Sequence, residues 1–127
     1  LDNRGIASRD FIYVEDICRG LMLCATAGIP GDVYNLASGM ETSIFELATL
    51  INKITGNPVS LEYLPERAWD RSGKRFGSTE KAKRCLGFEA RVNLSDGLQR
   101  TIEWTRQHLP MIDDCIHKHS TELRAAS

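Results

Sequence analysis

Long apolar runs are absent from this sequence. No stretch of the 127 residues approaches the ~20 consecutive apolar residues that cross a bilayer, and no signal peptide is visible. This sequence therefore shows neither a membrane-spanning helix nor an export signal. The hydrophobic content of 42% and the charged content of 26% are ordinary for a globular domain, and the length is enough to bury a core.

Cysteine is scarce, and its spacing is irregular. The four cysteines (Cys18, Cys24, Cys85 and Cys115) form no C-x-x-C pair, the spacing typical of zinc and redox sites. Two of them lie in a segment with helical periodicity, where cysteine serves as a small apolar residue. We therefore expect reduced thiols and a cytoplasmic location.

Familiar catalytic and nucleotide-binding motifs are also missing. The sequence contains no G-x-G-x-x-G turn, no Walker lysine motif, no H-E-x-x-H and no G-x-S-x-G elbow. The chain by itself therefore carries no dinucleotide fingerprint and no nucleophile paired with a base.

A strong net charge is lacking too, since the formal value is −1. Nothing global favours nucleic acid or a membrane surface as a partner. The distribution is uneven, however: residues 1–62 hold four Lys/Arg against eight Asp/Glu, and residues 63–127 hold twelve against nine. The basic run between Arg67 and Arg84 includes Trp69 and Phe76, which could stack on bases, but the overall charge and the absence of a nucleic-acid module disfavour that function.

Cys115, His117 and His119 alternate near the end of the chain, beside Asp113 and Asp114. Alternate residues diverge on a helix, and this spacing matches no zinc pattern, so we expect no metal site here.

Hydrophobic periodicity and turn residues predict an α/β order. The expected elements are a strand over 11–14 headed by Arg9, a helix over 16–27, a strand over 33–37 buried on both faces, a helix from a Ser43–Glu46 capping box to Gly56, a half-exposed strand over 59–64, a charged loop over 65–77, a short helix from Ser78–Thr79 to Leu86–Gly87, and a helix over about 95–109. This alternation favours some parallel strand pairing.

The domain organisation follows from the same pattern. The chain opens at Leu1 and reaches its first strand almost at once, and three strands make a small sheet, so we expect a segment of a longer protein. Residues 1–110 should form one unit, and residues 111–127 a mobile tail.

The best candidate binding groups are two arginines at strand-to-loop junctions, Arg9 and Arg67, with Asp70 close behind the second. Two guanidinium groups could hold a diphosphate through paired hydrogen bonds, and the aspartate could accept hydrogen bonds from a ribose. The alternative is a solvated loop in which Arg67 pairs with Glu66 or Asp70. Asn35 ends the 33–37 strand, where α/β sheets bind ligands, or it only orders the Ser38–Gly39 turn.

Several motifs in order resemble the NAD-dependent epimerase/dehydratase family, the extended short-chain dehydrogenase/reductases that act on nucleotide sugars, such as UDP-glucose 4-epimerase. They are Arg9-Asp10-Phe11-Ile12-Tyr13-Val14-Glu15-Asp16-Ile17, Val33-Tyr34-Asn35-Leu36-Ala37-Ser38-Gly39 with Thr42-Ser43-Ile44, Arg67-x-x-Asp70, Ser78-Thr79-Glu80-Lys81-Ala82-Lys83, Leu86-Gly87-Phe88 and Leu94-x-x-Gly97-Leu98. The resemblance covers roughly residues 5–108.

The resemblance implies the C-terminal part of such an enzyme. The glycine-rich NAD turn and a catalytic Tyr-x-x-x-Lys pair would precede Leu1, so NAD would be bound mainly outside this segment. The 16–27 helix and the 33–37 strand would complete the edge of a Rossmann-type sheet, and the rest would form most of a small substrate-binding lobe.

By the same resemblance, Arg9 and Arg67 grip the diphosphate of a nucleotide sugar, Asp70 faces the ribose and Asn35 matches a family asparagine. The complete enzyme would oxidise the sugar transiently at C4. The segment alone should be inactive, and as a dimer or by self-association it should cover its apolar faces. The basic run after Asp70 leaves epimerase, dehydratase and decarboxylase open, and the nucleotide and the sugar are not fixed. The rival hypothesis is a stand-alone, non-catalytic nucleotide- or phosphate-binding module.

Overall fold

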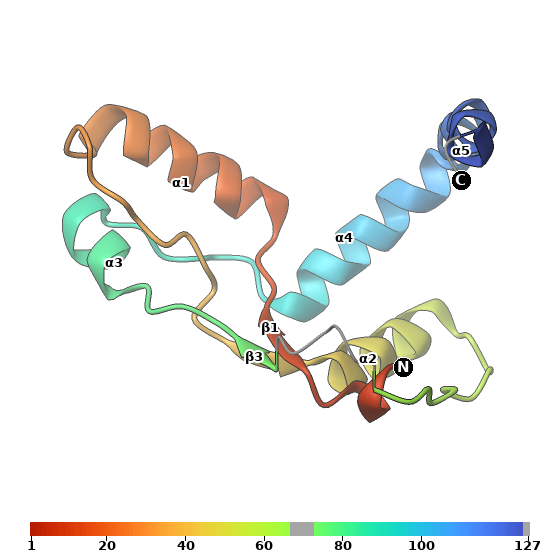
Figure 1. Ribbon diagram of the computed structural model, residues 1–127. Coiled ribbons are helices and arrows are strands. Elements are labelled where there is room, and N and C mark those ends of the chain that lie inside the picture. The colour runs from red at the N-terminus through yellow and green to blue at the C-terminus, as the bar shows by residue number, and fades with distance from the viewer. Residues whose placement is uncertain (67–72, 126–127) are drawn as a thin grey trace.

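The computed structural model describes residues 1–66 and 73–125, and side chains up to residue 119. The elements in order are a 3₁₀ turn η1 (Asn3–Gly5), β1 (Ser8–Asp10), α1 (Val14–Ala27), β2 (Glu41–Ser43), α2 (Ile44–Thr55), β3 (Lys74–Arg75), α3 (Glu80–Leu86), α4 (Leu94–Gln107) and α5 (Leu109–Ala125). The α/β class expected from the sequence is confirmed. Helices α1 and α3 lie on one side of the small sheet, and α2 lies on the other beside the N-terminus (Figure 1).

The described strands form one sheet in the order β2-β1-β3. β1 pairs with β2 antiparallel, with Asp10 opposite Glu41, and with β3 in parallel, with Arg9 opposite Arg75. The expected parallel pairing is therefore present. Because β1 is the middle strand, Arg9 lies at the centre of the sheet, within a strand and not at the head of one as expected.

The positions of all three predicted strands are wrong. The first strand is Ser8–Asp10, and residues 11–13 form an extended link that ends at Tyr13, the N-cap of α1. Residues 33–37 and 59–63 are irregular, and Leu64 makes only an isolated bridge to Asp2. A strand needs a neighbouring strand to pair with its backbone N–H and C=O groups, and no described segment makes backbone hydrogen bonds with residues 33–37.

The helices follow their local signals closely. Ser43 Oγ accepts a hydrogen bond from the Glu46 N–H, and Glu46 binds the Ser43 N–H in return, so the predicted capping box is confirmed. Gly56 ends α2 in the left-handed conformation, with φ of 69°. Asn93 caps α4 by accepting from the Asp96 N–H at 2.9 Å. Helix α5 was not expected beyond Pro110, and in Figure 1 it continues from the end of α4 away from the sheet.

The described core is small. Its buried apolar residues are Ala82, Leu86 and Phe88, with Ile12, Leu23, Cys24, Tyr34 and Leu36 packed around them. Gly20 lets α1 approach this cluster, because a Cβ at this position would lie 2.8 Å from Leu36 Cδ1 and 2.9 Å from Phe88 Cε2. The close approach of α1 to Leu36 and Phe88 therefore depends on glycine at position 20.

A buried carboxylate joins α1 to the segment before α4. Asp16, only 2% exposed, accepts hydrogen bonds from Arg19 Nη2 at 2.7 Å and from the N–H groups of Arg91 at 2.8 Å and Val92 at 2.9 Å. Burial alone would raise the pKa of Asp16, but the hydrogen bonds from Arg19, Val92 and Arg91 outweigh it and lower the pKa. The ionised carboxylate is therefore part of the folded structure.

The outer face of α1 is apolar and exposed. Leu21 is 57% exposed, Met22 is 65% exposed, and Val33, after the end of the helix, is 77% exposed. Exposed large apolar side chains of this kind can mark a surface that another chain segment covers.

We predict that Asp16→Asn lowers the free energy of unfolding by about 2–4 kcal/mol near pH 7, because buried N–H donors lose a charged acceptor. Since the folded-state pKa is lowered, the ionised carboxylate stabilises the fold above the ordinary Asp pKa of about 3.9, and this stabilisation is lost as the pH falls through the folded-state pKa. Urea unfolding from pH 7 to pH 3 should show the two proteins converging. The exposed Asp113→Asn is the control, and a constant difference at all pH values would contradict the assignment.

We also predict that the 127-residue chain self-associates through the outer face of α1. Sedimentation velocity should show dimers or larger species, and Leu21→Lys with Met22→Lys should shift the distribution toward monomer without loss of helical circular dichroism. Met111→Lys, on the exposed surface of α5, should leave the distribution unchanged. A wild-type chain that sediments as a monodisperse monomer would refute this prediction.

Candidate functional site

The candidate site lies where the N-terminal turn, β1 and the start of β3 meet. The local sequence Asp2-Asn3-Arg4-Gly5 favours a turn, and Asn3, Arg4 and Gly5 all adopt positive φ. Asn3 N–H donates to Leu64 O at 3.1 Å, and Ser8 N–H donates to Gly73 O at 3.1 Å. The N-terminal residues thereby hold the chain just before residue 67 and just after residue 72.

Arg9 is fixed by two carbonyl oxygens. Its Nη1 donates to Ser8 O at 2.7 Å and to Gly73 O at 2.9 Å. These contacts use one nitrogen of the guanidinium and orient its plane. The structure thus places Arg9 beside the segment that follows residue 72.

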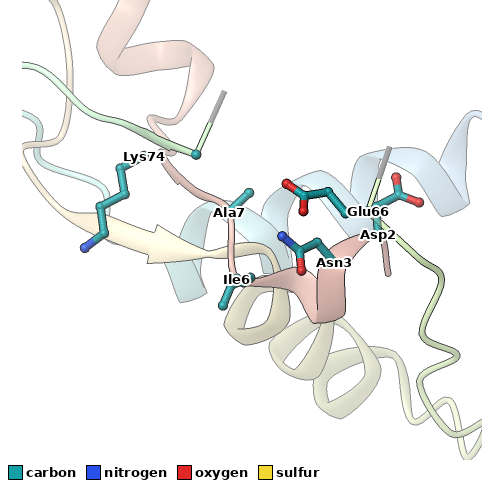
Figure 2. Close-up of a pocket in the computed structure, with 7 residues that line it drawn as sticks. Asp2, Asn3, Ile6, Ala7, Glu66 and Lys74 are labelled. Carbon is teal, nitrogen blue, oxygen red and sulfur yellow. The ribbon is translucent and has the colours of Figure 1, made fainter. Parts of the chain in front are cut away.

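A cavity of about 140 Å³ lies at this junction (Figure 2), and its lining residues are Asp2, Asn3, Ile6, Ala7, Glu66, Gly73 and Lys74. Figure 2 shows the side chains of Asp2, Asn3 and Glu66 gathered at one end, and the Lys74 amine directed away from them. Lys74 Nζ instead pairs with Glu41 Oε1 at 3.1 Å. Two carboxylates and a carboxamide suit the hydroxyl or N–H donors of a ligand better than a phosphate.

The sheet beneath the cavity is held by a polar network. Ser8, only 3% exposed, donates from Oγ to Glu41 Oε1 at 2.6 Å. The Ser8 hydroxyl and the Lys74 amine are the main causes that lower the pKa of Glu41. Glu41 is therefore an ionised acceptor that links β2 to β1 and β3.

Asn35 lies outside this cavity. Its Nδ2 donates to Ser78 O at 3.2 Å, and its side chain lies over Gly77, where an added Cβ would meet Nδ2 at 3.4 Å. Arg9 and Asn35 thus contact two parts of one segment, residues 73–78. Arg67 and Asp70 lie outside the described residues.

Sequence reasoning missed three features of the site: the left-handed turn at residues 3–5, the Ser8–Glu41–Lys74 network, and the hydrogen bonds of Asp10. The Asn-Arg-Gly sequence signals a turn. The other two depend on which strands pair, and no local pattern predicts that pairing.

No group of three or more His, Cys, Asp or Glu side chains in the described part of the chain could hold a metal ion. None of the described helices is both long and apolar enough to cross a membrane.

Comparison with known proteins gives consistent relatives. No protein-family model matches the chain. A dTDP-glucose 4,6-dehydratase of Actinoplanes sp. is 34% identical over 108 residues, which cover 83% of this chain and 32% of that protein. A UDP-glucose 4-epimerase of Mycolicibacterium smegmatis is 31% identical over 102 residues, covering 80% of this chain and 32% of that enzyme.

The solved structures agree. The Bordetella bronchiseptica enzyme WbmF, in complex with NAD+ and UDP, is 54% identical with a TM-score of 0.83, covering 97% of this chain and 36% of WbmF. This chain therefore spans about a third of the length of the proteins that it matches. The resemblance of that third to NAD-dependent nucleotide-sugar epimerases and dehydratases of the extended short-chain dehydrogenase/reductase family, with their Rossmann fold, is confirmed.

Proposed function

We propose that this chain is the nucleotide-sugar-binding part of an NAD-dependent epimerase or dehydratase. The observation that carries the proposal is the similarity to WbmF, at 54% identity over 97% of this chain, because that enzyme was solved with UDP and NAD+. The role of the chain is to bind and orient the substrate, which lowers the entropic cost of the reaction.

Arg9 is the proposed diphosphate anchor. A guanidinium whose plane is already set by Ser8 O and Gly73 O loses little further freedom when it binds a phosphate. The position of Arg9 at the centre of a three-stranded sheet adds to this rigidity. Arg67 as the second anchor, Asp70 at the ribose and Asn35 near the ligand remain predictions of the family resemblance.

The cavity at the N-terminal turn is the proposed place for hydroxyl groups of the substrate. Asp2, Asn3 and Glu66 present oxygen acceptors there. A diphosphate would be repelled by the two carboxylates, so the phosphates belong beside the guanidinium and the hydroxyl-bearing part belongs in the cavity.

NAD is proposed to bind mainly outside the residues of this chain. The link from β1 to α1, Phe11–Tyr13, contains no glycine, so it cannot form the glycine-rich turn that lets a backbone approach a pyrophosphate. NAD binding, and the Tyr-x-x-x-Lys pair of the resemblance, fall to the two thirds of the relatives' length that the chain does not span. We propose that the same missing portion covers the apolar face of α1, next to Val33.

The cysteines fit a reducing compartment, since all four are free and three of them, Cys18, Cys85 and Cys115, are exposed. We therefore propose a cytoplasmic location for the complete protein.

We predict that Arg9→Ala, in the complete gene product, weakens UDP binding by about 1.5–3 kcal/mol, the scale of a lost hydrogen bond to a charged group. Isothermal titration calorimetry measures it. Arg100→Ala is the matched control, because Arg100 is an exposed arginine that pairs with Glu15 at 3.1 Å. Equal affinities for wild type and Arg9→Ala would contradict the anchor role. The same measurement on Arg67→Ala tests the second anchor.

We predict that residues 1–127 alone produce no turnover of UDP-glucose, dTDP-glucose or UDP-glucuronate in the presence of NAD. Product analysis by chromatography checks this and, with the complete gene product, identifies the subgroup as epimerase, dehydratase or decarboxylase. Turnover by the isolated chain would contradict the proposal that NAD binding and the catalytic Tyr-x-x-x-Lys pair lie outside this chain. A complete gene product that binds none of these nucleotides would favour a different function.

A further inference from the structure

Asp10 ties the strand that carries Arg9 to the turn before β2. Its Oδ1 accepts hydrogen bonds from Ser38 N–H at 2.8 Å and Ser38 Oγ at 2.6 Å, and its Oδ2 accepts from Gly39 N–H at 2.8 Å. Ser38 Oγ in turn accepts from Met40 N–H at 3.1 Å. One carboxylate therefore fixes three consecutive residues.

The fixed turn forms a wall of a second cavity, of about 320 Å³. Ser38 and Met40 line it together with Phe11, the residue that follows Asp10, and with Thr42 of β2. Residues 90–94 line it as well. Asp10 itself is not among the lining residues, so its effect on the cavity passes through Ser38–Met40.

The carboxylate at Asp10 is not explained by strand pairing. Asp10 lies opposite Glu41 in the antiparallel register, and two like charges at facing positions destabilise a sheet. Each carboxylate is compensated by its own donors: Glu41 by Ser8 Oγ and Lys74 Nζ, and Asp10 by Ser38 and Gly39. A neutral side chain would avoid the repulsion, but it would not accept three hydrogen bonds from the turn.

We propose that Asp10 is a positioning residue for nucleotide-sugar binding, which acts by tying β1, the strand that carries the proposed anchor Arg9, to the Ser38–Gly39 turn before the ligand arrives. This inference rests on the proposed function. Residues alternate in direction along a strand, so β1 carries Arg9 toward one side and Asp10 toward the other. The hydrogen bonds of Asp10 thereby hold the strand beside Arg9, and an anchor held in advance reduces the entropic cost of binding.

The test compares Asp10→Asn and Ser38→Ala with a matched control in the complete gene product, with UDP as the probe. Asp10→Asn keeps the size of the side chain and replaces one acceptor oxygen with a donor, while Ser38→Ala removes one of the three donors. Glu46→Gln is the control, because Glu46 likewise accepts a backbone N–H and a serine hydroxyl, both from Ser43, but at the start of α2.

We expect Asp10→Asn to raise the UDP dissociation constant about tenfold, Ser38→Ala to raise it less, and Glu46→Gln to change it less than about twofold. The double variant, Asp10→Asn with Ser38→Ala, should raise the UDP dissociation constant by less than the product of the two single-variant factors, because both residues act through one contact. In turnover of the substrate identified above, KM should rise while kcat stays within about twofold.

A merely structural role would give another result: a smaller binding-competent fraction, with lower stoichiometry and kcat but an unchanged dissociation constant. That result would overturn the proposal, as would equal dissociation constants for Asp10→Asn and Glu46→Gln. If Asp10→Asn does not fold, an unchanged dissociation constant in Ser38→Ala overturns it. Failure of wild type to bind UDP, dTDP or their sugars would refute the proposed function itself, which separates the two failures.

Discussion

Hydrogen bonds from backbone N–H groups to two aspartates hold this fold together. The apolar core of the described chain is small, centred on Ala82, Leu86 and Phe88, so burial of apolar surface alone cannot order the irregular segments. Asp16 binds the N–H groups of Arg91 and Val92, and Asp10 binds those of Ser38 and Gly39. Each carboxylate joins residues far apart in the sequence, and hydrogen bonds to a charged group are stronger than neutral ones.

The candidate site depends on the same arrangement. β1 has three residues, yet it pairs with β2 on one side and β3 on the other, and Arg9 is its middle residue. Ser8 holds Glu41 and Asp10 holds the Ser38–Gly39 turn, so the two neighbours of Arg9 fix the strand that carries the anchor. Two cavities lie along this strand, one beside the N-terminal turn and one beside Phe11. Rigid elements of this kind support precise binding.

The exposed apolar surface of α1 agrees with the proposal that the chain is one part of a longer enzyme. Its inner face packs through Gly20 against Phe88, while Leu21, Met22 and the following Val33 remain exposed. Residues 33–37 have the apolar pattern of a buried strand, but no described segment pairs with them through backbone hydrogen bonds. A strand that is buried on both faces needs other chain segments to cover both faces. The chain spans only about a third of the length of the proteins that it matches, and contains too few such segments.

The sequence by itself determined the local structure and the family. Helix α2, from its capping box to Gly56, and the end of α3 at Gly87 follow from contacts within a few residues, which propensity and capping describe well. The ordered motifs identified the nucleotide-sugar enzymes. Tertiary structure alone decided that Ser8–Asp10 is the middle strand, that Asp10 and Asp16 are acceptors for distant N–H groups, and that Asn35 binds Ser78 O. These features depend on pairing between residues 28 or more positions apart, and no local pattern encodes which partners meet.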